Sequence, residues 1–531
     1  MVKSTGEGVG SGFMKKTVLS LDCGTQSIRG MIFDENGNLL AKEKIIYDPP
    51  YVSPELDWAE RDALLYWKET GLICNRLKAN HPEHFNSVIC VAITTQRDTC
   101  VPVDIKGEPL RNAILWMDQR KIASPKPIGR LYSWGTSAVG MRKTIENFSR
   151  SCPAHWIMEY ESDIWEKTHK YLMLSSFLNY KLTGKFIDSV SGQTGHLPFN
   201  YKKQVWDGKW GLKGRVFQIP SQKLCDIVPA GTVIGKITEE AALETGLPVD
   251  LPVIASGSDK ACETLGTGCV SEEIASVSLG SQATIETMSE RYYEVQPFIP
   301  PFPSAIDKKF NPEISVYRGF WMISWFKNEF AFREIQKAQV TGEAPEDVLN
   351  RGLKMIPPGS DGLMLQPFWG NELTRPESRG SIIGFKEDHT RFHIYRAIIE
   401  GIGFALKEGM EKIQKKSNVK ISRAAMSGGG AQSDEICQIM ADILNRETYR
   451  VQTQETSGLG AAICAFKGMG VYDSFEAAVH AMVKVKDVFS PDRNTSDIYA
   501  QLYEKGYAKI YKRLKPIYMM MEKIEHEDID K

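Results

Sequence analysis

The first stretch that could do chemistry is a polar turn between two apolar segments, within residues 17–40, TVLSLDCGTQSIRGMIFDENGNLL. Apolar residues precede and follow the turn, and an Asn-Gly pair comes next, which predicts a β-hairpin. Backbone N–H groups and short polar side chains in such a turn can surround phosphate oxygens, while a carboxylate can hold magnesium through water. The phosphate-binding candidates are Gly24, Thr25, Gln26 and Arg29, and the magnesium candidate is Asp22. An ordinary surface hairpin explains the same pattern.

Residues 275–288, ASVSLGSQATIETM, repeat this design of apolar strand, small polar turn and returning strand. Their turn contains Gly280, Ser281 and Gln282, which are further candidates for phosphate binding. Two such hairpins in one chain are expected of a duplicated nucleotide-binding fold, in which each half contributes one loop to a shared cleft. The second hairpin therefore favours the nucleotide-binding interpretation of the first.

A glycine-rich loop forms a third candidate nucleotide element, within ISRAAMSGGGAQSDEICQIMADIL. An apolar segment precedes the three glycines, and apolar residues at helical spacing follow them. Bare backbone at Gly428, Gly429 and Gly430 permits a flat ligand to approach closely, and Ser433 with Asp434 is expected to cap the helix. The sequence lacks the G-x-x-x-x-G-K-[ST] pattern, which excludes a P-loop kinase.

From about Lys16 to about Tyr472, the sequence resembles the FGGY carbohydrate kinases, which belong to the actin, hexokinase and Hsp70 superfamily. The resemblance implies two α/β domains of the actin-like (ribonuclease H-like) fold, with ATP and a small sugar or polyol meeting in the cleft between them. It also implies that the glycine loop binds adenosine, through Gly428, Gly429, Gly430, Ala431 and Gln432.

The same resemblance suggests how the chain is divided. Residues 16–269 are expected to form the N-terminal domain with the acceptor site and the first phosphate hairpin, and residues 270–480 the C-terminal, ATP-binding domain. Residues 481–531 are expected to form a helical extension. The opening residues 1–15 have the Gly/Ser content and low hydrophobicity of a flexible leader, which is excluded from the fold.

The candidate for the chemical step is Asp259, in the segment PVIASGSDKACETLGTG. A short apolar strand meets Gly257, and a helix is expected to start near Asp259, where N–H groups and the helix dipole favour an ionised carboxylate by about 0.3–1 kcal/mol. Those facts fit a simple capping residue equally well. The resemblance implies instead that Asp259 is the catalytic base that takes the proton from the acceptor hydroxyl.

A polar loop after the buried strand expected at 88–93 is the first acceptor-binding candidate, because ligands bind at the carboxyl ends of such strands. Its residues Gln96, Arg97 and Asp98 resemble the Gln-Arg-Glu loop of glycerol kinases, which implies contact with the acceptor. An Arg followed by an acid also suits a surface ion pair, which contributes only about 0–1 kcal/mol. His196, in a later polar loop, is expected to be solvent-exposed rather than catalytic.

A second acceptor candidate places Trp, Asp and Arg at alternate positions. In an extended backbone Trp116, Asp118 and Arg120 would point to one face, where an aromatic ring and two charged groups suit a polyhydroxyl ligand. A Trp beside a structural ion pair is the alternative. The spacing W-x-D-x-R is also the usual form in the FGGY kinases, which implies contact with the sugar.

Periodicity predicts the helices around these motifs. Residues 54–77 suit a helix entered through Pro54 and Asp57, with Leu64, Leu65, Trp67, Leu72 and Leu77 on or near a core-facing side. Residues 165–182 suit one packing helix, and residues 121–160 an irregular, lid-like region. Residues 395–413 suit a helix on the second sheet, and residues 497–525 a terminal amphipathic helix.

Composition narrows the classes of partner. The chain of 531 residues is too long for one core, and its 65 basic and 66 acidic residues give no electrostatic footprint for nucleic acid or an anionic membrane. There is no apolar run near eighteen residues and no signal-peptide pattern. Ten cysteines without C-x-x-C spacing indicate reduced thiols and a cytoplasmic protein, and a homodimer stays open as its assembly.

The expected activity is transfer of the γ-phosphate of ATP to a hydroxyl of a small sugar or polyol, with Mg²⁺. Because Asp98 is one methylene shorter than the Glu of glycerol kinases, the favoured acceptor is longer than glycerol: a pentulose such as xylulose or ribulose, or a four- or five-carbon polyol. Glycerol kinase is the alternative. An actin- or Hsp70-like ATPase, or a catalytically impaired sugar sensor, is the alternative from another class.

Overall fold

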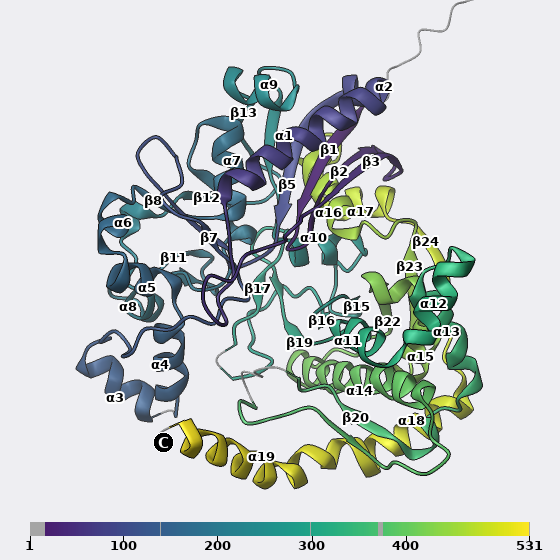
Figure 1. The fold of residues 1–531 in the computed structure, drawn as a ribbon. Coiled ribbons are helices and arrows are strands. Elements are labelled where there is room, and N and C mark those ends of the chain that lie inside the picture. Colours follow the sequence, from purple (N-terminus) through teal and green to yellow (C-terminus); the bar gives the residue numbers. More distant parts are fainter. Residues whose placement is uncertain (1–15, 139, 298, 370–374, 530–531) are drawn as a thin grey trace, which may run out of the picture.

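Two six-stranded sheets with the same strand order form the centre of the computed structural model (Figure 1). The structure describes residues 16–138, 140–297, 299–369 and 375–529, and the predicted leader, residues 1–15, lies outside them. In each sheet, a meander of three antiparallel strands is continued by two parallel strands and an antiparallel edge strand. The duplicated α/β architecture expected from the two hairpins is therefore present.

The strands of the first sheet, in spatial order, are β3 (Leu39–Ile46), β2 (Ser27–Asp34), β1 (Thr17–Cys23), β5 (Val88–Thr95), β14 (Pro252–Ala255) and β13 (Val233–Lys236). Those of the second sheet, in the matching order, are β19 (Glu313–Val316), β16 (Ala283–Glu286), β15 (Ile274–Leu279), β22 (Arg423–Ser427), β23 (Glu447–Val451) and β24 (Val485–Phe489). Both predicted hairpins are confirmed, as β1–β2 and β15–β16.

The parallel strands bring the candidate loops of each half together. Strands β1, β5 and β14 run in the same direction, so their carboxyl ends lie at one edge of the first sheet. That edge holds Asp22, the loop 96–98 and Asp259. Strands β15, β22 and β23 likewise place the turn after Leu279 and the glycine loop after Ser427 at one edge of the second sheet.

Two helices join the halves by packing across them. Helix α16 (Thr456–Gly468) belongs to the second half of the chain, yet it packs on β1 and β5 of the first sheet. Helix α10 (Asp259–Gly266) follows β14 of the first sheet and bonds to strands of the second sheet. The two helices cross closely because Gly266 and Gly460 carry no side chain at the crossing point, where a Cβ atom would meet the partner's backbone. Because each of these helices contacts the sheet of the other half, Asp259 at the start of α10 lies where the two halves meet.

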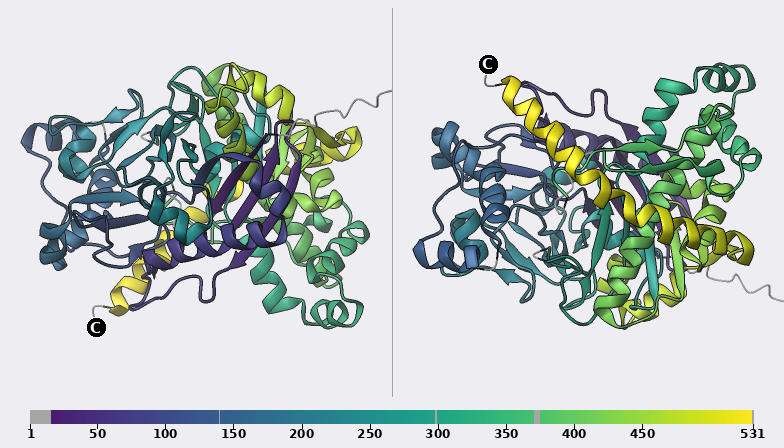
Figure 2. Two further views of the ribbon diagram at one scale, coloured as in Figure 1. Left: turned by 90° about the horizontal axis from the view of Figure 1, so that it is seen from above. Right: turned by 90° about the horizontal axis from the view of Figure 1, so that it is seen from below.

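The remaining helices lie around the two central sheets (Figures 1 and 2). In the first half these are α1 (Ala63–Asn80), α2 (Pro82–Asn86), α3 (Arg130–Ala138), α4 (Arg142–Arg150), α5 (Pro153–Tyr160), α6 (Ser162–Lys167), α7 (Leu174–Thr183), α8 (Leu212–Phe217) and α9 (Glu239–Thr245). In the second half they are α11 (Trp321–Phe330), α12 (Phe332–Thr341), α13 (Pro345–Gly352), α14 (Arg391–Ser417), α15 (Asp434–Leu444), α17 (Phe475–Met482), α18 (Arg493–Leu502) and α19 (Ala508–Ile529).

Small sheets complete the fold. One has four strands, in the order β4 (Glu60–Arg61), β7 (Ala113–Ile114), β6 (Cys100–Val103) and β8 (Lys170–Met173). The two-stranded ones are β10 (Phe199–Asn200) with β11 (Val205–Trp206), β12 (Asp226–Val228) with β9 (Ile187–Ser189), β17 (Phe302–Pro303) with β18 (Phe310–Asn311), and β20 (Met364–Gln366) with β21 (Ser381–Ile383). All ten cysteines are buried free thiols, and no described helix is long and apolar enough to cross a membrane.

The helix predicted from residue 54 begins later and turns a different face to the core. Helix α1 starts at Ala63, and the side chain of Asp62 caps it by accepting a hydrogen bond from the Leu64 N–H. Leu64, Leu65 and Leu72 are exposed, against the prediction. The buried face contains Trp67 and Leu77 together with residues on the same side of the helix, because that side points at the sheet. These residues are Tyr66, Thr70, Ile73 and Cys74.

Residues 165–182 do not form one helix, as their spacing predicted. Helix α6 ends at Lys167, strand β8 follows, and α7 begins at Leu174. The short apolar run 170–173 pairs with β6, and this tertiary pairing overrides the local helical pattern. The region 121–160, expected to be irregular, contains helices α3, α4 and α5.

The expected helical extension from residue 481 begins with a strand. Residues 485–489 form β24, the edge strand of the second sheet, paired with β23. The predicted terminal helix is present as α18 and α19, joined by a π-helical turn at 503–507. In Figure 2, α19 runs along the underside of the molecule from the second half toward the first.

Candidate active site

Asp259 lies in the first turn of α10, as predicted, directly after strand β14. The preceding Ser258 is the N-cap, since its side chain accepts a hydrogen bond from the Ala261 N–H, so Asp259 is free of the capping role. Its Oδ1 lies 3.8 Å from Nε of Arg97, and its side chain is 30% exposed. Burial raises the pKa of Asp259 above its usual value, although Arg97 and Lys260 oppose the shift. The dipole argument from sequence gave the wrong direction because burial outweighs it.

Lys260, the next residue, connects the helix to the second sheet. Its Nζ lies 2.7 Å from Glu263 Oε2 and 2.7 Å from Ser278 Oγ, on strand β15. Glu263 also accepts a hydrogen bond of 2.7 Å from Ser427 Oγ, at the end of β22. Burial acts to raise the pKa of Glu263, but Lys260 lowers it below its usual value. The network therefore ties the candidate base to the strands that carry both nucleotide loops of the second half.

Arg97 and Asp98 point to different partners. The Arg97 guanidinium donates to Glu313 Oε2 at 2.7 Å and stacks on the ring of Phe302, both from the second half of the chain. Asp98, whose φ is +50°, instead accepts hydrogen bonds from the backbone N–H and Nδ1 of His196, at 2.9 and 2.7 Å. Arg97 therefore faces Asp259, while Asp98 is held in place by the 195–196 loop.

His196 is a site residue that sequence analysis did not assign. Its ring lies between those of Phe148 and Phe217, and its Nε2 is 3.2 Å from Ser151 Oγ. Burial acts to lower the pKa of His196, but the Asp98 carboxylate reverses this and raises the pKa above its usual value. A lone His in a loop gave no signal for this contact, because Asp98 is 98 residues away in sequence.

Thr25 connects the first hairpin to the acceptor loops. Its hydroxyl donates to Gln96 Oε1 at 2.5 Å and accepts a hydrogen bond from Trp116 Nε1 at 3.0 Å. Gln96 also donates to the Tyr66 hydroxyl at 3.2 Å. The structure thus places a predicted phosphate-binding residue against two predicted acceptor-binding residues.

The segment 116–120 is a turn and not the extended strand that the alternation predicted. The Asp118 N–H donates to the Leu115 carbonyl at 3.0 Å, which closes the turn. Arg120 donates to both carboxylate oxygens of Asp118 at 2.8 Å and to Glu60 at 2.7 Å, and its side chain is 1% exposed. Asp118 and Arg120 therefore form a buried ion pair that holds the turn of Trp116, which corresponds to the structural alternative.

Asp22 occupies the predicted place at the end of β1. Its Oδ2 accepts a hydrogen bond of 3.0 Å from Arg29, which also approaches Glu455 at the start of α16. Glu455 in turn accepts a hydrogen bond of 3.0 Å from Lys42. Burial raises the pKa of Asp22 to about 6, which Arg29 opposes and Asp259 reinforces. The effect of Asp259 indicates that the magnesium candidate and the candidate base belong to one electrostatic site.

The glycine loop is only partly available to a ligand. Gly428 has φ +80°, and a Cβ atom there would lie 2.8 Å from the Leu279 carbonyl carbon. A Cβ atom on Gly430 would lie 2.3 Å from the Phe320 ring. Only Gly429 of the three has open space around it. Two of the glycines are thus required for packing the loop on β15 and Phe320, and bare backbone faces solvent at one position.

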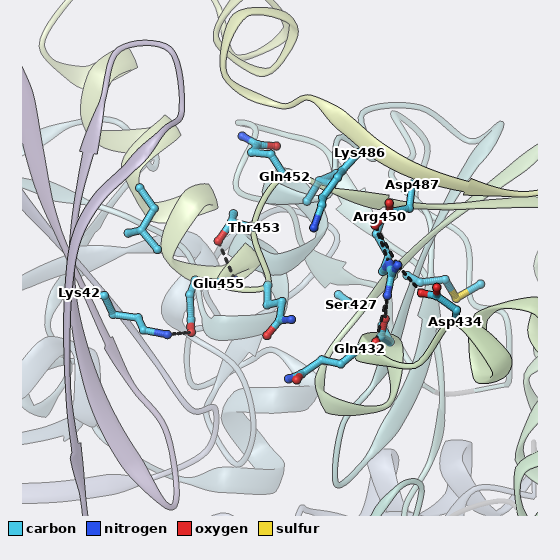
Figure 3. Close-up of a pocket in the computed structure, with 16 residues that line it drawn as sticks. Lys42, Ser427, Gln432, Asp434, Arg450, Gln452, Thr453, Glu455, Lys486 and Asp487 are labelled. Carbon is cyan, nitrogen blue, oxygen red and sulfur yellow. Dashed lines mark hydrogen bonds and ion pairs between the residues drawn. The ribbon is translucent and has the colours of Figure 1, made fainter. Parts of the chain in front are cut away.

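A cavity of about 490 Å³ adjoins this loop (Figure 3). Ser427, Gln432 and Arg450 line one side, and Glu455 lies opposite them beside Lys42, which comes from strand β3 of the first half (Figure 3). Arg450 donates to the Ala431 and Gln432 carbonyls at 3.1 Å and so holds the loop in place. The volume lies within the range of small-molecule sites, about 300–1,000 Å³.

The other predicted phosphate-binding residues lie where a ligand could reach them. Gln26 and Ser281 are exposed, and Gly24, Thr25, Gly280 and Gln282 are half-buried. The Gly280 and Ser281 carbonyls accept hydrogen bonds from the backbone at the start of α11, which fixes the second turn. No described residues form a cluster of three or more His, Cys, Asp or Glu side chains suited to a metal ion.

Comparison with known proteins decides the family. The N-terminal domain of the FGGY family of carbohydrate kinases matches residues 17–266, and the C-terminal domain of that family matches residues 275–469. The chain belongs to this family. It is therefore a sugar phosphotransferase by family, rather than a member of the actin- or Hsp70-like ATPase groups of the superfamily.

Relatives and solved structures match almost the whole chain. An uncharacterised sugar kinase of Escherichia coli is 28% identical and covers 93% of both chains. A xylulose kinase of Lactococcus lactis is 26% identical, and the match covers 94% of this chain and 97% of that kinase. A gluconokinase of Bacillus subtilis is 25% identical, and the match covers 96% of each chain.

Among crystal structures, a gluconate kinase from Lactobacillus acidophilus has a TM-score of 0.80 at 21% identity, covering 96% of this chain and 100% of its own. The glycerol kinase of Plasmodium falciparum with ADP has a TM-score of 0.74 at 20% identity, covering 93% and 98%. These matches confirm the predicted actin-like kinase fold.

The site contains further residues that motifs did not indicate. Glu313 and Glu286 approach Arg97 from the second sheet, Glu455 joins the Asp22 cluster, and Lys260 reaches across to β15. For Lys260 its position beside Asp259 was an available signal. The others had none, because each contact joins segments far apart in the chain.

Proposed function

We propose that this FGGY kinase transfers the γ-phosphate of ATP to the terminal hydroxyl of a pentulose such as xylulose or ribulose, or of a four- or five-carbon polyol. The observation that carries the proposal is the position of Asp259. This carboxylate does not cap the helix, its side chain is 30% exposed, and it lies 3.8 Å from a predicted acceptor-binding arginine. Burial raises the pKa of Asp259 above its usual value, which makes the carboxylate a stronger base.

Asp259 would remove the proton of the attacking hydroxyl as the new O–P bond forms and the bond between the γ-phosphorus and the bridging oxygen breaks. ADP then leaves, carrying that oxygen. Phosphoryl transfer needs little covalent help, so positioning and charge stabilisation account for most of the acceleration. Lys260, beside the base and bonded to β15, is placed to keep the base near the phosphate turn 280–282.

The acceptor would bind between Arg97 and Trp116, with Asp98 held at the rim by His196. Trp116 donates its indole N–H to Thr25 and packs edge-on against Tyr317, so one face of the ring can meet the C–H side of a polyol. Asp118 and Arg120 would act indirectly, by fixing the Trp116 turn.

Magnesium fits the chemistry of the Asp22 site. Mg²⁺ in kinases is commonly held by one or two carboxylates together with substrate phosphates and water, and Asp22 is a buried carboxylate beside the phosphate turn. Bound there, the ion would neutralise charge on the phosphate oxygens. Gly24, Thr25, Gln26, Gly280, Ser281 and Gln282 would contact phosphates, with adenosine near Gly429 and Gln432.

A coupled ADP-release assay over a panel of acceptors tests the proposal. Glycerol, tetritols, pentitols, pentuloses and hexuloses are compared at fixed MgATP, and the true acceptor is expected to exceed analogues lacking one recognised hydroxyl by up to about 10⁴-fold in kcat/KM. The highest kcat/KM with glycerol, or an unchanged acceptor KM in Arg97→Ala, would contradict the assignment. No turnover with any compound would favour the sensor alternative.

Glycerol kinase remains the second candidate because the Gln96-Arg97-Asp98 loop resembles that group. The side chain of Asp98, one methylene shorter than the Glu of glycerol kinases, is turned toward His196. The shorter side chain favours an acceptor longer than glycerol, and the same panel separates the two candidates.

A further inference from the structure

Two glutamates of the second domain enter the acceptor site, and no motif assigned them. Glu286 and Glu313 face each other as a register pair on the antiparallel strands β16 and β19. Glu313 accepts a hydrogen bond of 2.7 Å from Arg97 Nη2, and its side chain is 8% exposed. Glu286 is buried, and its Oε2 accepts a hydrogen bond of 3.3 Å from the Asn311 amide. The carboxylate nearest to Arg97 therefore comes from the opposite domain, and not from neighbouring Asp98.

The environment of Glu286 favours its protonated form. Burial, followed by the repulsion of Glu313, raises the pKa of Glu286 to about 8. Burial acts to lower the pKa of Arg97, but Glu313, Asp259 and Glu286 together raise it. The arrangement thus places Glu313 against Arg97, with Glu286 beside it on the neighbouring strand.

Four cations near Asp259 lie close to carboxylates. Arg97 is paired with Glu313 and lies near Asp259, and Lys260 is paired with Glu263. His196 is paired with Asp98. The next cation, Lys213, lies over the rings of Phe148, Tyr201 and Phe217 and is balanced electrostatically by Glu294 and Asp207. Among the described residues near Asp259, none of these four cations lacks a nearby carboxylate.

This balance bears on a choice that the comparisons leave open, because the relatives include both xylulose kinases and gluconokinases. A hydroxyl group can donate to an acceptor-only carboxylate. A sugar-acid carboxylate would instead meet the like charges of Glu313, Asp98 and Asp259, while Arg97 and Lys260 are already paired with carboxylates. Like charges placed together at a binding site repel one another and so exclude the wrong ligand.

Resting on the kinase function above, we propose that Glu313 is an acceptor-binding, specificity-determining residue that selects uncharged ketoses and polyols against sugar acids. It does so in two ways: it accepts a hydrogen bond from an acceptor hydroxyl, and it occupies Arg97, the cation that a carboxylate would otherwise seek. Selection of this kind uses a repulsive group as well as an attractive one.

The first test uses the unaltered full-length protein with MgATP in the coupled ADP-release assay. The highest kcat/KM among neutral ketoses and polyols of four to six carbons is compared with the highest among aldonic acids of the same lengths, D-gluconate and D-xylonate included. A preference of about 100-fold or more for the neutral set is expected. A sugar acid that reacts as well as the best neutral compound overturns the inference and leaves the kinase function intact. Turnover with neither set instead contradicts the kinase function.

The second test is Glu313→Gln, which keeps the shape and removes the charge. We expect KM for the best neutral acceptor to rise, and the ratio of sugar-acid to neutral kcat/KM to increase by about 10-fold or more, because one like charge is removed. A residue with only a structural role would lower both rates in parallel, so an unchanged ratio overturns the assignment. If the variant fails to fold, the comparison with the unaltered protein still decides.

Glu334→Gln is the matched control. Glu334 belongs to the same domain, its side chain is 6% exposed, and it accepts hydrogen bonds from a single arginine, Arg391, as Glu313 does from Arg97. It lies on α12, outside the acceptor site. The control is expected to keep the sugar-acid to neutral ratio of the unaltered protein, and a change of that ratio equal to that of Glu313→Gln would contradict a local effect.

Discussion

The two halves of the molecule share one strand order but present different chemistry at their matching edges. The edge of the first sheet carries charged side chains, with Asp22 after β1, Arg97 after β5 and Asp259 after β14. The edge of the second sheet presents mainly backbone, in the turn 280–282 and the loop 428–432. The duplicated frame therefore carries two different kinds of edge, with charged side chains in the first half and mainly backbone in the second.

The halves are not independent, because each lends residues to the other. Helix α10 bonds to β15 and β22, α16 packs on the first sheet, and Glu313 reaches Arg97 from the second sheet. Substitutions in either half can therefore test how the two edges differ. The largest effects are expected where a side chain of the first half takes part in the reaction.

Among the substitutions in the first half, Asp259→Asn is expected to lower activity the most. The amide keeps the shape but cannot accept the hydroxyl proton, so kcat should fall by about 10²–10⁴-fold, with little change in ATP affinity. Steady-state ADP release and nucleotide titration measure the two quantities. Asp250→Asn, at a 74%-exposed side chain of the same domain, is the control and should behave as wild type. Near-normal turnover in Asp259→Asn would rule out the role of base.

Asp22→Ala tests whether this carboxylate takes part in holding magnesium. The variant should need a higher Mg²⁺ concentration for half-maximal activity, because one carboxylate that would hold the ion is removed. The expected increase is about 10-fold, which corresponds to about 1.4 kcal/mol. A magnesium titration at saturating ATP measures it. An unchanged titration would mean that Asp22 only supports its hairpin through Arg29.

Gly428→Ala and Gly429→Ala separate the two roles of the glycine loop in the second half. At Gly428 the positive φ and the contact with Leu279 predict a loss of about 1–3 kcal/mol in the free energy of unfolding. At Gly429 the space is open, so stability should be unchanged and ATP affinity should be the property affected. Thermal unfolding and ATP titration compare the variants, and equal melting temperatures would contradict the packing role of Gly428.

The smallest effect concerns the His196–Asp98 pair. Because the folded-state pKa of His196 is raised, its stabilising contribution is present below its ordinary pKa and is lost as the pH rises through the higher folded value. The melting temperature of the wild type should therefore fall slightly more between pH 6 and pH 9 than that of His196→Gln. Parallel pH profiles of the two proteins would show that the pair contributes nothing measurable.

Much of the frame was predictable because it depends on local signals. Apolar runs and small polar turns marked β1–β2 and β15–β16, a helix begins at Asp259 as expected, and the helix after Ser433 begins where its capping residue indicated. Helix α1 and residues 165–182 show the limit of periodicity. In both cases the spacing was real, but which residues face the core, and whether 170–173 forms a strand, depend on a neighbouring sheet.

The sequence by itself determined which residues carry reactive groups and which backbone positions require glycine, because these are properties of residue type and short spacing. Tertiary structure alone decided how those groups are used. It turned Asp98 to His196 and closed Arg120 on Asp118, and it brought Glu313 to Arg97 across 216 residues of chain. Burial at the junction of the two halves raises the pKa values of Asp22 and Asp259, against what the helix dipole alone predicts for Asp259. Desolvation and long-range ion pairs arise only when distant segments pack together, so no local pattern records them.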